Sequence, residues 1–135
     1  MLSEIAIGLG CRQGVAAGPV ETLVRQVLAE APLYRRAALF TIARRAGEPG
    51  LRQAAAELGL ELTFLDEAEF LRRQQEFLTR GATPSARARA LAGLSSVAEG
   101  AALMGGGLQA QLLVPRRAVS SVTCAIAADP NKVET

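Results

Sequence analysis

Blocks of apolar residues recur along the chain with two different spacings, and together they predict strands that alternate with helices. The first block, residues 4–10, has the length of a short strand and leads directly into a glycine-rich turn that contains Cys11 and Arg12. A helical stripe follows, with apolar side chains three or four positions apart: Val20, Leu23, Val24, Val27 and Leu28. The chain is therefore expected to begin with a strand, a glycine turn and a helix, in that order.

The alternation continues in the next stretch. Residues 37–43 form an unbroken apolar run, which is typical of a central strand covered on both faces. Pro49 suits the first turn of a helix and Gly59 suits its end, so a helix is expected between them. Residues 60–65 predict a third strand. Asp66, with an acidic residue three positions later, predicts the cap of a further helix.

The second half of the chain is less regular. Residues 67–80 are consistent with one helix, and a second helix is expected to begin at residues 95–99. The last two apolar blocks, residues 108–114 and 119–127, predict two strands. The short polar connection between them, residues 115–118, predicts a hairpin turn at that position.

These elements predict an α/β fold, a three-layer α/β/α sandwich with a mixed, mostly parallel sheet of about five strands. We expect a single domain over residues 1–128, followed by a polar C-terminal tail at residues 129–135. Residues 85–92 carry arginines and few apolar side chains, and no regular element is predicted there.

Composition restricts the chemistry. Of the 135 residues, 50% are hydrophobic and only 4% aromatic, so the core is expected to consist of aliphatic side chains. The chain has no histidine, which excludes Ser–His and Cys–His nucleophiles and makes a zinc or haem site improbable. Cys11 and Cys124 do not have metal-ligand spacing and are expected to be free thiols. We predict no metal, no other cofactor, no membrane span and no signal peptide, and hence a cytoplasmic protein.

The positive charge comes almost entirely from arginine. The formal net charge is +2, and Lys132 is the only lysine. Three adjacent pairs stand at predicted strand boundaries: Arg35 and Arg36, Arg44 and Arg45, and Arg116 and Arg117. Arginines at strand boundaries on the same side of a sheet can all face one cleft. A compositional bias toward arginine explains the surface positions equally well. Nucleic acid is not favoured as a partner, because the net charge is small and no aromatic residues lie between the arginines.

The glycine turn is the strongest candidate site. Exposed backbone N–H groups beside a helix N-terminus attract carboxylates and phosphates, and Arg12 adds a bidentate donor. Gly14 could equally serve only to permit a tight turn. Cys11 is a candidate reactive thiol, because Arg12 and the helix start would lower its pKa. Alternatively, it is a small residue that fits a crowded turn.

Other segments are expected at the same edge, because ligands of such folds bind outside the carboxyl ends of parallel strands. These are residues 44–48, the chain from Asp66 onward, and the helix start at residues 95–99. Glu48 could orient a guanidinium or act as a base, or could simply supply negative charge at a helix N-terminus. Ser96 and Glu99 could face the ligand, but an S-x-x-E capping box also accounts for both.

Four segments together carry a resemblance to a known family. They are residues 8–14 (Gly-Leu-Gly-Cys-Arg-Gln-Gly), 48–51 (Glu-Pro-Gly-Leu), 96–103 (Ser-Val-Ala-Glu-Gly-Ala-Ala-Leu) and 122–127 (Val-Thr-Cys-Ala-Ile-Ala). In order and spacing the chain resembles the CobE/CbiG C-terminal domain family of cobalamin (vitamin B12) biosynthesis, in its stand-alone CobE-like form. Where that family tends to have two lysines, this chain has Arg45 and Arg116. The exchange keeps the charge, but it disfavours chemistry that needs a neutral amine.

The resemblance implies a protein that binds or acts on a carboxylate-rich precorrin or corrin intermediate, with other enzymes of the pathway as further possible partners. CbiG is associated with opening a ring lactone, so a hydrolase-type activity is one possibility and simple binding of the intermediate is another. The substrate-binding residues expected on this basis are Gly8, Gly10, Cys11, Arg12, Gly14, Arg45, Glu48, Ser96, Glu99, Arg116 and Thr123. Arg12, Arg45 and Arg116 are expected to converge on one cleft.

Two alternatives remain open at this level. The spacing Gly8-x-Gly10-x-x-x-Gly14 is close to a dinucleotide-binding fingerprint, with Arg44 and Arg45 placed to meet a phosphate. The chain could also be a non-catalytic module that supports a partner enzyme.

Overall fold

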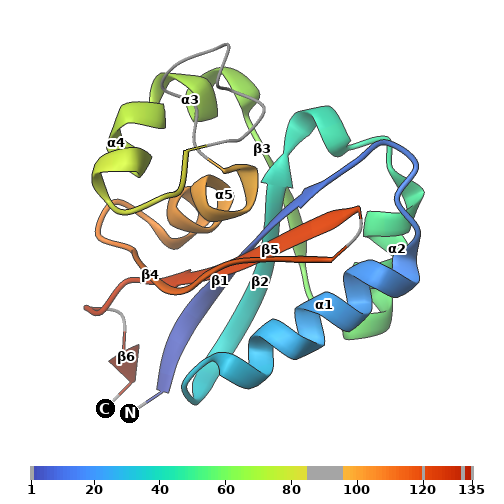
Figure 1. Ribbon diagram of the computed structural model, residues 1–135. Coiled ribbons are helices and arrows are strands. Elements are labelled where there is room, and N and C mark those ends of the chain that lie inside the picture. Colours follow the sequence, from blue (N-terminus) through green and yellow to red (C-terminus); the bar gives the residue numbers. More distant parts are fainter. Residues whose placement is uncertain (1, 85–95, 120, 132, 135) are drawn as a thin grey trace.

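The computed structural model describes residues 2–84, 96–119, 121–131 and 133–134. The predicted irregular stretch at residues 85–92 and the first residue of the expected helix start, Ser95, lie outside the described residues. The described part contains a six-stranded sheet with helices on both faces (Figure 1). The α/β/α sandwich expected from the sequence is confirmed.

The first half of the chain alternates strands and helices. Its elements are β1 (Leu2–Cys11), α1 (Ala17–Glu30), β2 (Tyr34–Ile42), the short 3-10 helix η1 (Ala43–Arg45), α2 (Pro49–Leu58) and β3 (Leu62–Leu65). In the second half these are followed by α3 (Glu67–Arg72), α4 (Gln74–Thr79), α5 (Val97–Gly106), β4 (Gln111–Val119), β5 (Val122–Ala128) and β6 (Val133–Glu134).

The sheet is mixed. The strand order is β3-β2-β1-β5-β4, and β6 pairs with the start of β1. Strands β1, β2 and β3 are parallel neighbours, whereas β5 runs antiparallel to both β1 and β4. The carboxyl ends of β1, β2 and β3 therefore lie at the same end of the sheet, and the turn between β4 and β5 also lies at this end. We call it the carboxyl edge.

Alternation along β1 divides the core into two layers. Ile5, Ile7 and Leu9 are buried together with the apolar stripe of α1 on one face. Ala6 and Gly8 point to the other face, which α5 covers (Figure 1). A Cβ on Gly8 would lie 1.8 Å from the carbonyl oxygen of Ala98. Glycine is therefore required for α5 to pack directly on β1.

Local end signals account for several helix boundaries. Pro49 begins α2, and Gly59 ends it in the left-handed region with φ of 68°. The Asp66 side chain accepts a 2.9 Å hydrogen bond from the Glu69 backbone N–H at the start of α3. These boundaries agree with the prediction. The single helix that residues 67–80 allowed is instead two short helices, α3 and α4, which are separated at Arg73.

The predicted hairpin turn at residues 115–118 is wrong. These residues lie inside β4, and the turn falls between Val119 and Val122. Pro115 is compatible with a strand here because β4 is an edge strand, where a missing N–H donor on the open side costs no ladder hydrogen bond. Two register shifts on either side of Val114 accommodate the irregular backbone.

No helix in the part of the chain that the structure describes is both long and apolar enough to cross a membrane.

Candidate functional site

The carboxyl ends of the parallel strands bring together the segments expected to form the site. β1 ends at Cys11, which lies opposite Val122 at the start of β5. β2 leads into η1, and the first turn of α5 approaches Gly10 from the other side of the sheet. We call Cys11, Arg12, Gly14, Arg45 and Glu48 the glycine-turn cluster. The other expected residues belong to β1, β4, β5 and the start of α5.

Arg45 is fixed to the glycine turn. Its Nε donates a 2.9 Å hydrogen bond to the carbonyl oxygen of Cys11, 34 positions earlier in the chain. The guanidinium also contacts the Cys11 thiol, but it has no carboxylate partner among the described residues. It is therefore available for a ligand carboxylate. A guanidinium held by one nitrogen is oriented before any ligand arrives, and less side-chain entropy is lost on binding.

Glu48 already occupies part of the predicted anion site. Its Oε1 accepts a 2.7 Å hydrogen bond from the backbone N–H of Gly14. Gly14 has φ of 78°, a left-handed conformation that glycine adopts without strain and that places this N–H toward η1 and α2. The turn therefore binds a carboxylate, but that carboxylate belongs to the chain itself.

Cys11 does not have the electrostatics of a reactive thiol. Burial raises its pKa above the usual value; the nearby Arg45 guanidinium works against this shift and the Glu48 carboxylate adds to it. The expectation that Arg12 and the helix start would lower this pKa is wrong, because the sequence did not show that the thiol is half-buried. At neutral pH the thiol is protonated and is a poor nucleophile. Both cysteines are free.

Gly10 and Thr123 form a close contact beneath the cluster. The Thr123 hydroxyl donates a 3.3 Å hydrogen bond to the Gly10 carbonyl oxygen across the β1–β5 pair. A Cβ on Gly10 would lie 2.6 Å from that hydroxyl oxygen. Like Gly8, this glycine permits close packing at the base of the site.

Glu99 lies inside the protein. Its side chain is 1% exposed, with Oε1 accepting from the Thr83 N–H at 2.7 Å and Oε2 from the Arg116 N–H at 3.1 Å. The cap expected from Ser96 is present, because its hydroxyl accepts from the Glu99 N–H at 3.4 Å. Glu99 thus joins α5, the segment after α4 and strand β4, and so helps to position Arg116.

The adjacent arginines have different environments. Arg44 forms an ion pair with Glu67, and Arg117 forms one with Glu30 at 2.8 Å. Arg45 turns instead to the glycine turn. Arg116 is exposed, and its side chain has no ion-pair partner among the described residues.

Arg12 is also exposed and lies at the same edge. Its backbone N–H donates a 3.0 Å hydrogen bond to the carbonyl oxygen of Ser121 in the β4–β5 turn, which fixes the base of the side chain there. Its guanidinium has no hydrogen-bond or ion-pair partner among the described residues. Arg12 therefore contributes an exposed, unpaired charge to the glycine-turn cluster.

Thr41 is a residue of this edge that the sequence did not single out. It is fully buried, and its hydroxyl donates a 2.8 Å hydrogen bond to the carbonyl oxygen of Leu9. The bond joins the carboxyl ends of β1 and β2 just before the glycine turn and η1. A threonine in an apolar run is typical of strands in general, so no sequence signal marked this role.

The described residues contain no group of three or more Cys, Asp or Glu side chains placed to hold a metal ion. The glycine-turn cluster consists of two arginines, one carboxylate and a protonated thiol around a glycine turn. This arrangement can bind anions, and it contains no activated nucleophile. Arg116 lies apart from it in β4, the outermost strand, where its neighbour Arg117 is level with Leu9 through Cys124.

The fold and this edge define an α/β sandwich with an arginine-bearing site at the carboxyl ends of its parallel strands. Comparison with known proteins gives the family: residues 5–127 match the family described as "Cobalamin synthesis G C-terminus". The chain therefore belongs to this family, that of CobE and the CbiG C-terminal domain, and is a cobalamin biosynthesis protein.

Three relatives support the assignment. Protein CobE of Sinorhizobium sp. is 33% identical over 127 residues, which are 91% of this chain and 79% of that protein. The crystal structure of a CobE from the cobalamin pathway superposes with a TM-score of 0.75 at 35% identity, covering 94% of this chain and 91% of that one. The cobalt-precorrin-5A hydrolase of Priestia megaterium is 30% identical over 130 residues, but the chain spans only 32% of its length.

Proposed function

We propose that this chain binds a carboxylate-rich precorrin or corrin intermediate at the carboxyl ends of its parallel strands. The observation that supports this most directly is the anchored Arg45, which has no carboxylate partner among the described residues at the glycine turn. Arg12 lies at the same end of the sheet, exposed and without an ion pair among the described residues. Arg116 is also exposed, but it lies farther away, inside the outermost strand β4.

The chemistry of the ligand class fits these side chains. Such intermediates are flat apolar rings that carry acetate and propionate groups around the rim. A charge-assisted hydrogen bond contributes about 1.5–3 kcal/mol, so two or three arginine–carboxylate contacts are enough to fix the ring. Val119, partly exposed at the end of β4, adds apolar surface at the same edge.

Binding is favoured over bond cleavage. The Cys11 thiol is protonated, and the chain has no histidine. Glu48 is the one carboxylate of the glycine-turn cluster, and one of its oxygens is held by Gly14. The match covers only 32% of the hydrolase relative, so the activity of that longer protein is not carried over to this chain. We infer that this chain holds or delivers the intermediate, with Glu48 as the only local candidate for a base.

A dinucleotide ligand is disfavoured by the position of the glycines. The fingerprint requires its glycines in the turn between strand and helix, where the backbone approaches the pyrophosphate. Gly8 and Gly10 instead lie within β1 and face α5, and only Gly14 is in the turn.

A visible-absorbance titration tests the proposal. The purified chain is titrated against a panel of precorrin and corrin intermediates, and in parallel against NADPH. A saturable spectral change with one intermediate and none with NADPH supports the proposal. If neither ligand binds and the chain instead co-purifies with another pathway enzyme, the supporting-module alternative holds and the proposal fails.

A further inference from the structure

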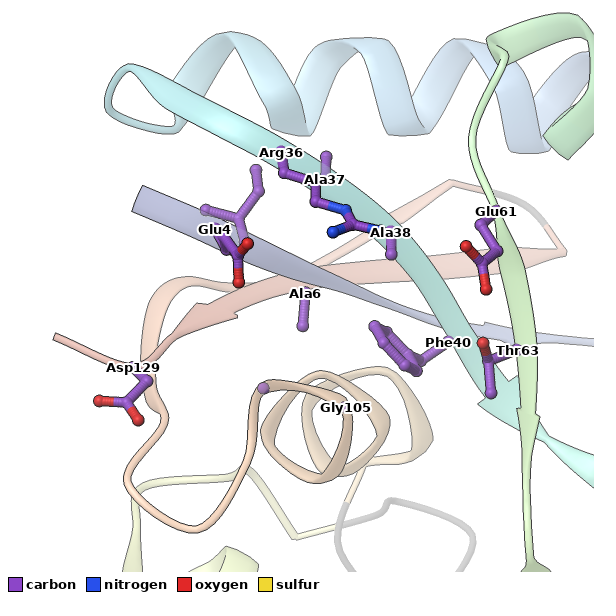
Figure 2. Close-up of a pocket in the computed structure, with 12 residues that line it drawn as sticks. Glu4, Ala6, Arg36, Ala37, Ala38, Phe40, Glu61, Thr63, Gly105 and Asp129 are labelled. Carbon is purple, nitrogen blue, oxygen red and sulfur yellow. The ribbon is translucent and has the colours of Figure 1, made fainter. Parts of the chain in front are cut away.

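A cavity lies at the opposite end of the sheet from the glycine-turn cluster. Its volume is about 250 Å³, and it opens between the amino ends of the central strands and the last turn of α5 (Figure 2). We call it the amino-end cavity. Its walls carry Glu4 from β1, Arg36 and Phe40 from β2, and Glu61 and Thr63 from the β3 segment.

The cavity exists because the residues around it are small. Ala6 and Ala38 form part of the sheet floor, and α5 ends over them with Gly105 and Gly106. A Cβ on Gly105 would lie 2.5 Å from the Phe40 ring, so α5 contacts this ring tightly and then stops. The sheet continues beyond the helix, and that uncovered stretch is the floor of the cavity.

Two of its carboxylates already have partners. Glu4 pairs with Arg35 at 2.7 Å. Asp129, at the far side of the cavity, is 7% exposed and accepts a 2.8 Å hydrogen bond from the Asn131 backbone N–H. Neither carboxylate is paired with Arg36.

Two opposite charges remain unpaired. Neither the Arg36 guanidinium nor the Glu61 carboxylate makes a hydrogen bond or an ion pair with any described residue, although both line the same cavity. In Figure 2 the guanidinium of Arg36 lies between the carboxylates of Glu4 and Glu61. A cavity with separated, unpaired charges of opposite sign is complementary to a molecule that carries both charges.

Two further features of the cavity favour a positive group in the ligand. The C-terminus of α5 carries partial negative charge, and its last turn contains no basic residue. The Phe40 ring offers an aromatic wall that a cation can approach. The volume is below the range of about 300–1,000 Å³ that drug-sized ligands occupy, so the cavity suits a small molecule.

We propose that the amino-end cavity binds a small zwitterion whose ammonium and carboxylate groups stand at opposite ends. The carboxylate contacts Arg36 and the ammonium contacts Glu61. This site is separate from the proposed intermediate-binding site, and it adds a second, small-molecule ligand to the chain.

The test uses matched probes and amide NMR of the full chain. ε-Aminocaproate carries both charges, whereas hexylamine and hexanoate each carry one of them on the same carbon chain. The expected result is a saturable shift of the Ala6, Ala38 and Gly105 amides with ε-aminocaproate, and binding weaker by about tenfold or more with either single-charge probe. No saturable shift, or equal binding of hexylamine alone, overturns the proposal.

Charge-neutral variants test whether Arg36 and Glu61 form the binding site. Arg36→Gln and Glu61→Gln are each expected to weaken ε-aminocaproate binding by about tenfold, while Arg25→Gln and Glu57→Gln, exposed on α1 and α2, leave it unchanged. Unchanged binding in the Arg36 and Glu61 variants overturns the proposal. The corrin titration of the same two variants is expected to match the unmodified chain, so failure at one end of the sheet is distinguishable from failure at the other.

Discussion

The carboxylate of Glu48 accepts a 2.7 Å hydrogen bond from the backbone N–H of Gly14, and this bond joins the glycine turn to the start of α2. The shape of the turn is therefore held by the chain itself, without a ligand. It also means that a ligand carboxylate meets the arginines of this edge before it meets the backbone.

Replacing Glu48 is expected to destabilise the fold modestly. Glu48→Ala leaves the Gly14 N–H without its partner, and because this contact is partly exposed we expect a loss of about 1 kcal/mol in the free energy of unfolding. Urea unfolding measures it. Glu57→Ala, an exposed glutamate of the same helix, is the control. Equal losses in both variants would show that the turn does not depend on this bond.

The buried Glu99 is expected to be far more sensitive than its exposed neighbours. In Glu99→Gln the new amide places an NH2 group against a backbone N–H that needs an acceptor, so one buried donor is left unsatisfied. We expect a loss of about 2–3 kcal/mol in the free energy of unfolding, against less than about 0.5 kcal/mol for Glu57→Gln. A Glu99→Gln variant as stable as the parent would contradict the bridging role.

The close approach of α5 to β1 predicts a strong effect at one glycine. Gly8→Ala places a methyl group against the backbone of Ala98 and Ala102, which cannot move without shifting α5. We expect a loss of about 1–3 kcal/mol or more, measured by thermal unfolding. Gly18→Ala, where the added Cβ meets open space within α1, is expected to be neutral or slightly stabilising. Similar melting temperatures for the two variants would refute this packing.

The fold is expected to lose stability in alkaline solution through Cys124. Burial raises its pKa from 9.0 to about 12. Between these values the unfolded thiol releases its proton and the folded thiol keeps it, so the unfolded state binds fewer protons and stability falls as pH rises. Urea unfolding at several pH values above 9 measures the slope. Cys124→Ala is expected to have a shallower slope, and an unchanged slope would exclude this thiol as the cause.

Local signals in the sequence were sufficient for the first half of the fold. These signals act over a few residues, and the structure agrees with each of them. They are the proline and glycine at the ends of α2, the Asp66 cap and the apolar run of β2. The position of the β4–β5 turn could not be found in this way. Whether a proline ends a strand depends on whether that strand lies at the edge of the sheet, which is a tertiary property.

For the same reason, the chemistry of the site could be predicted only in part from the sequence. Strand order predicted that the glycine turn, residues 44–48 and the start of α5 would lie together, and the contacts of Gly10, Gly14 and Arg45 agree with this. The convergence of Arg116 with Arg12 and Arg45 stays a prediction. The Glu48–Gly14 bond, the raised pKa of Cys11 and the burial of Glu99 depend on contacts between residues 16 or more positions apart. The amino-end cavity had no sequence signal, because it is formed where a helix ends over a sheet.

The central claim is tested most directly by repeating the corrin titration with Arg12→Ala and Arg45→Ala against Arg44→Ala. Arg44 is the neighbour of Arg45, but it forms its ion pair with Glu67. We predict that each of the first two variants weakens binding of the intermediate by about tenfold or more, and that Arg44→Ala binds like the unmodified chain. Equal affinity in all three variants would contradict an intermediate-binding site at the carboxyl ends of the parallel strands.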